Sequence, residues 1–327
     1  MTDKEEWTVR STRQDSGFLP TLGVTLWLGW NGGIICLALY SAFFAGFRER
    51  TAILGLVLVS YLTPRDLSIG FRLGNWCMSQ AEKYFGLTTI LENEDALLKV
   101  PREKAIIYAF EPHDILPYPV FAFNSSLKRF PSHNGKDFSA LMTSVIFQLP
   151  FLRQMYTWVG GNPIDKATFK RRLARGESFA FVPGGVQEVT NLDPASPTDI
   201  PLYLKSRKGF IRLALATGAP IVPVFGFNID GSYGYWIPRG GLVTKLARKI
   251  GFLPLVFWGR FGVPFGIPRA RNIAVVCGKP IDVPCEGDNV KEETVAKIHA
   301  DFLQAMEALF ERHKNENGYG SRKIRII

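Results

Sequence analysis

The chain begins with long stretches that carry no charge. From Ser16 to Phe47 no Asp, Glu, Lys or Arg occurs, and this run exceeds the roughly 20 apolar residues with which a helix crosses a bilayer. After Arg48, Glu49 and Arg50, residues 51–64 form a second uncharged run, which is short for an independent span. The pattern favours a hairpin of two membrane helices over residues 16–64, with a shortened second arm.

Two other arrangements fit the same uncharged runs. One is a single span followed by a segment that lies in the membrane interface, and the other is a pair of helices buried in a soluble core. In a membrane, Trp27, Trp30 and Tyr40 would serve as interfacial anchors. A cleaved signal peptide is disfavoured, because the run is too long and acidic residues crowd the region before it.

From Lys104 onward, short apolar runs alternate with helical stretches, which is typical of a layered α/β domain. Runs rich in β-branched and aromatic residues predict strands at 104–110, 177–183, 220–227 and 272–278. Helices are predicted at 138–148, 165–175, 207–217 and 290–314. The last helix has the clearest apolar stripe, and we expect His299 and His313 on its exposed surface.

These patterns divide the chain into five parts. They are a polar tail without regular structure (1–15), the membrane hairpin (16–64), an interfacial helical connector (65–103), a catalytic domain (104–320) and a basic tail (321–327). Within the catalytic domain, residues 228–271 are rich in Gly, Pro and aromatics, and predict an irregular insertion that could lie on a membrane or cover an acyl chain.

The amino-acid composition of the chain limits the kinds of molecule that it is expected to bind. The chain has 327 residues, enough for one large α/β domain or two smaller ones without disulfides, and its four cysteines form no CxxC pair. No zinc site or disulfide framework is therefore indicated. The net charge of +10 comes largely from local Lys and Arg clusters that suit anionic lipid, phosphate or nucleic acid. Nucleic-acid binding has only this charge in its favour.

A histidine stands where the first predicted strand ends. His113 follows Pro112, which favours extended backbone before it, and lies between Glu111 and Asp114. An imidazole with a pKa near 6.5 can accept a hydroxyl proton, while a carboxylate holds its tautomer. Either Glu111 or Asp114 could take that orienting role, and a turn histidine bonded to backbone is the plain alternative.

A glycine pair follows the second predicted strand. In PGGVQE, Gly184 and Gly185 give a backbone that can approach a ligand closely and turn its amides toward an oxyanion, with Glu188 close by. An ordinary strand-to-helix turn would use the same residues. The sequence also lacks GxSxG, GxxxxGK[ST] and HExxH, so a serine hydrolase elbow, a P-loop and a zinc protease are not signalled, and no metal site is expected.

A basic run precedes the third helix of the domain. In KSRKGFIR, Lys208 and Arg212 stand four residues apart on one helix face, next to Arg207. That face could hold the phosphates of a cofactor or substrate. A solvated cationic surface is the alternative.

Five motifs occur in a fixed order: EPHDILP, GGNP (160–163), FVPGGVQE, RKGFIRLALATGAPIVPVFGF and VCGKPI. Together with the hairpin before them, they resemble the type-2 diacylglycerol acyltransferase family, and the EPH form resembles its plant and algal branch. The ordered match covers about residues 100–320. The resemblance implies a glycerolipid-acyltransferase-like α/β domain with a central mixed sheet behind an N-terminal membrane hairpin.

The resemblance implies a reaction as well as a fold. A fatty acyl group would pass from acyl-CoA to the free hydroxyl of diacylglycerol without a cofactor, at the endoplasmic reticulum membrane or lipid droplet, with the catalytic domain facing the cytosol. His113 would be the base, the amides of Gly184 and Gly185 would stabilise the oxyanion, and Arg207, Lys208 and Arg212 would contact CoA. Asp114 departs from the family, where a small residue is usual.

Several points stay open at this level. Related glycerolipid acyltransferases carry HxxxxD, but position 118 is Tyr118, so the carboxylate partner of His113 is not fixed. Monoacylglycerol or a long-chain alcohol could replace diacylglycerol as acceptor. A non-catalytic membrane lipid-binding protein is the alternative of another class, and a homo-oligomer is compatible with the sequence.

Overall fold

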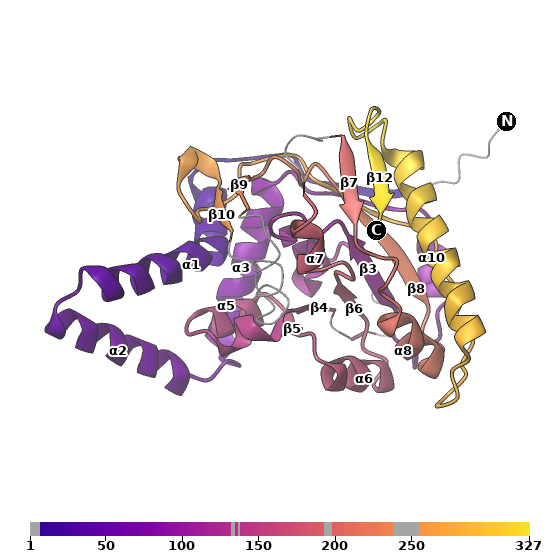
Figure 1. The fold of residues 1–327 in the computed structure, drawn as a ribbon, viewed down its shortest axis with the longest axis horizontal. Coiled ribbons are helices and arrows are strands. Elements are labelled where there is room, and N and C mark those ends of the chain that lie inside the picture. The colour runs from indigo at the N-terminus through magenta and orange to yellow at the C-terminus, as the bar shows by residue number, and fades with distance from the viewer. Residues whose placement is uncertain (1–6, 132–134, 137, 193–197, 238–254) are drawn as a thin grey trace.

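An eight-stranded mixed sheet forms the centre of the computed structural model, which describes residues 7–131, 135–136, 138–192, 198–237 and 255–327 (Figure 1). The strand order is β1 (Thr8–Ser11), β2 (Thr88–Leu91), β11 (Ala274–Cys277), β8 (Ile221–Phe227), β3 (Ile107–Glu111), β6 (Phe179–Phe181), β4 (Ser139–Met142) and β5 (Gly161–Pro163). From β8 to β5 all neighbours are parallel, whereas β11 is antiparallel to β8 and parallel to β2. The predicted α/β fold with a central mixed sheet is confirmed.

The four predicted strands are β3, β6, β8 and β11, which are consecutive neighbours in the middle of this sheet. Their side chains point alternately into two apolar layers. Ile107 and Ala109 belong to one layer, and Tyr108 and Phe110 belong to the other. Because both faces are covered, these strands are continuous apolar runs, and such runs can be recognised from sequence.

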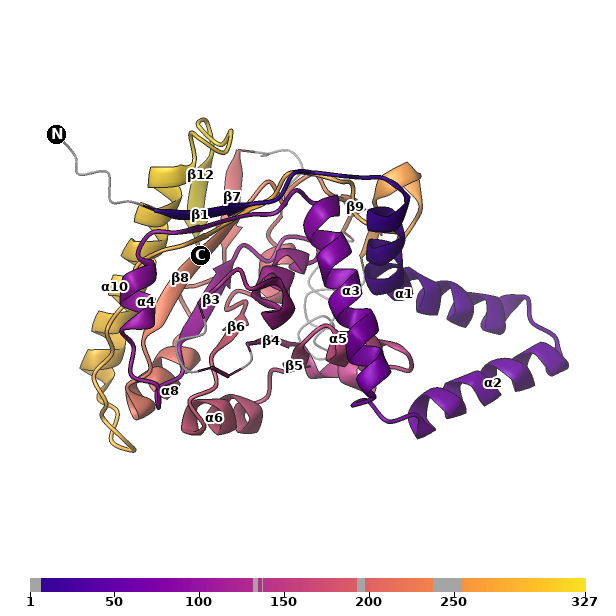
Figure 2. The same ribbon diagram turned by 180° about the vertical axis from the view of Figure 1, so that it is seen from behind.

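Helices cover both faces of the sheet (Figures 1 and 2). One face packs against α6 (Lys166–Ala174), α8 (Gly209–Thr217) and α10 (Glu292–His313), which confirms three of the predicted helices. The other packs against α3 (Ser68–Tyr84), the first half of α1 (Phe18–Phe43) and the short helix η1 (Tyr118–Phe123). Shorter elements complete the body: α4 (Glu94–Leu98), η2 (Ser125–Leu127), η3 (Ser144–Gln148), α5 (Leu152–Trp158), α7 (Val186–Val189) and η4 (Arg260–Gly262).

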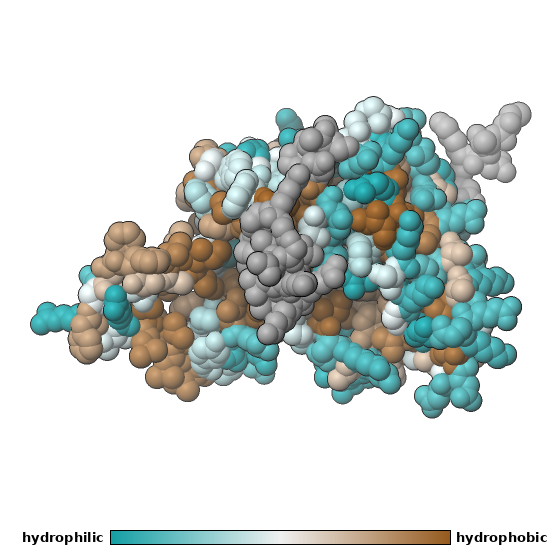
Figure 3. Space-filling model, in the orientation of Figure 1, coloured by the Kyte–Doolittle hydropathy of each residue, from teal (hydrophilic) through white to brown (hydrophobic). Residues whose placement is uncertain are grey.

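Two antiparallel helices, α1 (Phe18–Phe43) and α2 (Phe47–Leu62), project from the body within the span predicted as a hairpin. Their outer parts expose many large apolar side chains, which form the brown arms of Figure 3. Among the described residues, α1 is the one helix long and apolar enough to cross a membrane, and 28% of its most apolar window is buried against the body. Membrane insertion of the pair stays a prediction.

Several segments fold differently from the sequence prediction. Residues 8–11 of the presumed tail form β1, residues 323–326 of the basic tail form β12 (Lys323–Ile326), and the helical connector contains β2. The predicted helix at 138–148 is wrong: β4 occupies residues 139–142, and η3 follows it. β12 pairs with β7 (Asp199–Leu202), far away in the chain. Short edge strands of this kind depend on their partners, so their local pattern predicts them poorly.

The aromatic insertion at 228–271 contains a small hairpin of β9 (Gly234–Trp236) and β10 (Val256–Trp258). In β9 and β10, Trp236 is exposed while Phe257 is buried. Residues 238–254 of the insertion lie outside the described residues. The predicted role as a cover for an acyl chain therefore stays a prediction.

The two histidines of α10 are buried, contrary to prediction. His299 Nε2 lies 2.9 Å from the Leu204 carbonyl oxygen. His313 Nε2 lies 3.0 Å from Glu92 Oε1, and Trp7 stacks on the His313 ring with centroids 4.2 Å apart. Arg312 completes the cluster with two hydrogen bonds to Glu92, of 2.7 and 2.8 Å. This cluster joins the end of α10 to β2 and the N-terminal segment.

Replacing Glu92 by glutamine should lower the free energy of unfolding by about 1–3 kcal/mol, because the buried partners of the carboxylate lose its charge. Burial raises the pKa of Glu92, but the hydrogen bonds from His313 and Arg312 outweigh it and lower the pKa overall. The loss of stability should therefore be largest above pH 4.5, the ordinary pKa of glutamate, and should shrink as the pH falls through the lowered pKa of Glu92. Chemical denaturation in detergent at several pH values measures this loss of stability.

The control is Glu311, an exposed residue paired with Lys314. Glu311→Gln should change the free energy of unfolding by less than about 0.5 kcal/mol.

Candidate active site

The turn after β3 carries His113, and one nitrogen of its ring is hydrogen-bonded to the main chain. His113 Nδ1 lies 2.8 Å from the main-chain carbonyl oxygen of Asp114. A carbonyl oxygen only accepts, so Nδ1 carries the hydrogen and Nε2 keeps its lone pair. The expectation that the carboxylate of Glu111 or Asp114 orients His113 is therefore corrected, since the main chain of Asp114 does so. Asp114 has a φ of +47°, a left-handed conformation that directs its carbonyl back to the ring.

Burial disfavours the charged form of His113. It lowers the pKa of the imidazole, and the hydrogen bond to Asp114 opposes this effect only in part. The neutral ring is thus the main form at physiological pH. A neutral imidazole with a free Nε2 is what a general base requires.

Two buried carboxyls, Glu111 and Glu188, join the turns together. Glu111 Oε1 accepts a hydrogen bond of 2.8 Å from the Gly184 amide. Glu188 Oε2 accepts one of 2.7 Å from the His113 amide, and Glu188 Oε1 accepts one of 2.9 Å from the Tyr203 amide. Both carboxyls are almost completely buried, with exposed fractions of 0% and 1%. They hold the main chain of the histidine turn, the glycine turn and the segment after β7 in one arrangement.

The pKa values of both carboxyls are raised. Burial, and then the charge and hydrogen bond of Glu188, raise the pKa of Glu111 well above its ordinary value. Burial raises the pKa of Glu188 as well, against the hydrogen bonds that it accepts. Glu188 needs both oxygens to accept amide hydrogens, whereas Glu111 Oε2 has no donor within the described part of the chain. Of the two carboxyls, Glu111 is therefore the one that we assign to the protonated form.

The glycine turn packs against these two carboxyls. A Cβ on Gly184 would lie 1.8 Å from Glu188 Oε1, so only glycine fits beneath that side chain. The Gly184 amide is already bonded to Glu111, and this leaves Gly185, with a φ of +58°, as the candidate for the expected oxyanion contact. Sequence reasoning found both glycines but missed this reason for the first. It also missed the Tyr203 amide, which no motif marks.

The three predicted CoA contacts lie in different surroundings. Arg207 Nη2 donates a hydrogen bond of 3.1 Å to the Gly184 carbonyl, and its guanidinium lies 5.0 Å from the centre of the Tyr203 ring. Arg212 is turned toward α10, where it forms a two-pronged ion pair with Glu292. Lys208 precedes α8 as its N-cap residue. The structure thus places Arg207 beside the glycine turn and Arg212 away from it.

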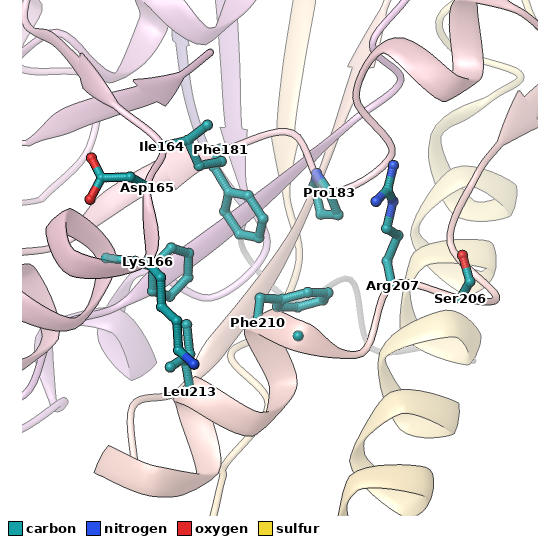
Figure 4. Close-up of a pocket in the computed structure, with 11 residues that line it drawn as sticks. Ile164, Asp165, Lys166, Phe181, Pro183, Ser206, Arg207, Phe210 and Leu213 are labelled. Atoms are coloured by element: carbon teal, nitrogen blue, oxygen red, sulfur yellow. The ribbon is translucent and has the colours of Figure 1, made fainter. Parts of the chain in front are cut away.

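A cavity of about 300 Å³ opens between α6 and α8, beside Arg207 (Figure 4). Its floor is aromatic, with Phe169, Phe181 and Phe210, and Lys166 stands at its rim. Figure 4 shows Arg207 and Pro183 side by side at the end that faces the glycine turn. We call this the cationic cavity, and Lys166 is a lining residue that the sequence marked only as part of a basic cluster.

A second, apolar cavity of about 110 Å³ lies on the other face of the sheet. Its walls include Leu116 and Tyr118, which follow the histidine turn directly, and Trp27 of α1. The apolar run after EPHD was the signal in the sequence that could have predicted it. The cavity brings the first helix of the hairpin to the segment that carries His113.

Comparisons with known proteins agree with these motifs. The sequence model of a family described as diacylglycerol acyltransferase matches residues 51–325. The chain is 34% identical over 228 residues to diacylglycerol O-acyltransferase 2 of Dictyostelium discoideum, covering 65% of this chain and 67% of that protein. It is 28% identical over 237 residues to the mouse protein of that name, covering 65% and 57%. Acyl-CoA wax alcohol acyltransferase 2 of Mus musculus is 27% identical over 244 residues, covering 69% and 70%.

Among solved structures, the 1-acyl-sn-glycerophosphate acyltransferase PlsC from Thermotoga maritima is similar, with a TM-score of 0.40 and 14% identity. The match covers 90% of this chain and 95% of that one.

Proposed function

Because the chain belongs to the diacylglycerol acyltransferase family, we propose that it transfers a fatty acyl group from acyl-CoA to the free hydroxyl of diacylglycerol, forming triacylglycerol and CoA. One observation carries the proposal. His113 lies in the turn just after the central strand β3, with Nδ1 bonded to the main chain and the lone pair of Nε2 able to accept a proton. The relatives of the same name support diacylglycerol as the acceptor.

The reaction needs one base and no covalent enzyme intermediate. The acceptor oxygen attacks the thioester carbonyl carbon while His113 Nε2 takes the hydroxyl proton. The tetrahedral intermediate then collapses, the C–S bond breaks, and the imidazolium returns the proton to the CoA thiolate. The Gly185 amide is our candidate donor to the oxyanion.

Glu188 and Glu111 act on the reaction through His113, as positioning residues. Glu188 holds the His113 amide and Glu111 holds the Gly184 amide, so the base and the glycine turn keep a fixed separation. We assign no role to the Asp114 carboxylate in orienting the base. Its main-chain carbonyl carries that role.

We assign the cationic cavity to the phosphates and pantetheine arm of acyl-CoA. Arg207 and Lys166 supply positive charge, and the aromatic floor suits the uncharged arm. Lys208, just before α8, extends this charge toward solvent. Arg212 is left out of the assignment, because Glu292 occupies its guanidinium.

Replacing Lys166 by alanine should raise the apparent KM for oleoyl-CoA about threefold to tenfold, as expected for one exposed charge contact, with little change in kcat. Arg212→Ala is the matched control from the neighbouring helix, and its KM should stay at the wild-type value. Initial rates against oleoyl-CoA concentration at low and high salt measure both. An equal rise in the two variants would contradict the assignment.

We propose that the α1–α2 pair inserts in the bilayer that holds diacylglycerol and triacylglycerol. At 1.5 Å per residue α1 is about 39 Å long and α2 about 24 Å, but the first half of α1 packs against the body. The free outer half of α1 and the whole of α2 are therefore each shorter than a hydrocarbon core of about 30 Å, and they would enter the bilayer through the apolar side chains that they expose. The endoplasmic reticulum membrane or the lipid droplet surface, with the catalytic body in the cytosol, suits these substrates.

The test is expression in a yeast that makes no triacylglycerol. Membranes with labelled oleoyl-CoA and an equal mixture of dioleoylglycerol, monooleoylglycerol and hexadecanol should form triacylglycerol as the main product and release CoA. Wax ester as the main product would favour the second candidate, which the similarity to wax alcohol acyltransferase 2 supports. A lipid-binding protein without activity would release no CoA with any acceptor.

A further inference from the structure

A third cavity, of about 290 Å³, touches the catalytic turns. Pro112, Asp114 and Glu188 form its inner wall, and Asp199, Asp230 and Arg322 are among its outer residues. Four carboxyl groups therefore face one guanidinium. We call it the acidic cavity.

The lining of the acidic cavity includes a buried donor without a partner. Tyr233 is 3% exposed, and its hydroxyl forms no hydrogen bond within the described part of the chain. A buried hydroxyl without a partner costs about 1–3 kcal/mol, so its retention beside a cavity points to a ligand. An ester carbonyl or a hydroxyl of a bound molecule would satisfy it.

Tyr233 also stands close to the apolar cavity. Burial raises the pKa of Tyr233, and the nearby groups Tyr118, Tyr156, Tyr84 and Asp114 raise it further. Tyr118 and Tyr156 line the apolar cavity, whereas Asp114 lines the acidic one. Tyr233 packs in the same apolar layer as Tyr118 and Tyr156, and it also lines the acidic cavity.

The outer wall of the acidic cavity is fixed by the C-terminal segment. Arg322 forms an ion pair of 2.5 Å with Asp230, and the Tyr319 hydroxyl donates to Asp230 while accepting a hydrogen bond of 2.8 Å from the Asn228 amide. Asp230 is thus occupied by the protein itself. Asp114, 9% exposed, is the carboxyl nearest to His113 that remains for a ligand.

We propose that the acidic cavity binds the polar head of the acyl acceptor, a neutral glycerol unit that carries a free hydroxyl and ester carbonyls. Tyr233 donates to an ester carbonyl, Asp114 accepts from a hydroxyl, and the acyl chains of the acceptor extend past Tyr233 into the apolar cavity. This inference rests on the proposed acyl transfer and adds where its acceptor binds.

Tyr233→Phe tests the subsite by removing one oxygen atom. The apparent KM for dioleoylglycerol in mixed micelles should rise about fivefold to tenfold, the value of one buried hydrogen bond, while the KM for oleoyl-CoA stays unchanged. Tyr108→Phe is the matched control. Tyr108 is also fully buried, and its hydroxyl has no hydrogen-bond partner among the residues that the structure describes, but it does not line this cavity. The KM of the Tyr108→Phe variant for dioleoylglycerol should equal that of the wild type.

Asp114→Asn gives a second measurement. An amide accepts more weakly than a carboxyl, so the rise in KM should be larger for monooleoylglycerol, which brings two free hydroxyls, than for dioleoylglycerol. The acceptor subsite would be overturned if the KM of Tyr233→Phe for dioleoylglycerol were unchanged, or if Tyr108→Phe showed the same rise. The proposed function would still stand in that case, provided that the wild type forms triacylglycerol. A wild type that esterifies neither glyceride would overturn the proposed function, and the subsite with it.

Discussion

Triacylglycerol formation should fall about 100-fold to 10,000-fold when His113 is replaced by alanine, which is the usual contribution of a general base. The variant keeps both substrates bound, so the loss should appear in kcat. Among the described residues, the His113 side chain forms one hydrogen bond, to the Asp114 carbonyl, and its removal should leave the protein folded. Membranes with equal amounts of wild type and variant, supplied with labelled oleoyl-CoA and dioleoylglycerol, provide the measurement. If the variant turned over substrate at the wild-type rate, His113 could not be the general base.

The same base sets the acid side of the pH profile. The active form is the neutral ring, and burial lowers the pKa of His113 below the ordinary 6.5. The midpoint of the acid limb of the wild-type kcat profile should therefore lie below pH 6.5. A midpoint above pH 6.5 would show that the imidazole is stabilised in its charged form, contrary to the structure.

Glu188 and Glu111 should respond differently to the same conservative change. Glu188→Gln places an amide group opposite the amides of His113 and Tyr203, both of which need an acceptor. We expect a loss of about 2–5 kcal/mol in the free energy of unfolding and the loss of most activity, because the buried donors and the main chain of the base are released. Chemical denaturation and initial rates measure the two effects.

Glu111→Gln is the control, and it should be tolerated. Its carbonyl oxygen can still accept from the Gly184 amide, and its NH2 can take the place of the protonated oxygen beside Glu188. Most activity and stability should remain at neutral pH. Equal losses in the two variants would contradict the placement of the proton on Glu111.

Local pattern was sufficient where a segment is buried on both sides. β3, β6, β8 and β11 were predicted from apolar runs, and three long helices were predicted from their stripes, because the environment of each is uniform along its length. The edge strands β1 and β12 and the helix expected at 138–148 were mispredicted. Their structure depends on pairing with segments far away in the chain.

The sequence by itself determined the family, the central strands and the positions of His113 and Gly184 just after two of those strands. Only the tertiary structure decided what each of these groups contacts. It gave His113 the Asp114 carbonyl instead of a carboxylate, paired Glu111 with Glu188, and turned Arg212 away to Glu292. The physical reason is that a motif fixes residue types along a strand and its turn. Hydrogen bonds and charge pairs form between turns that are distant in sequence, and their geometry exists only once the parallel strands align them.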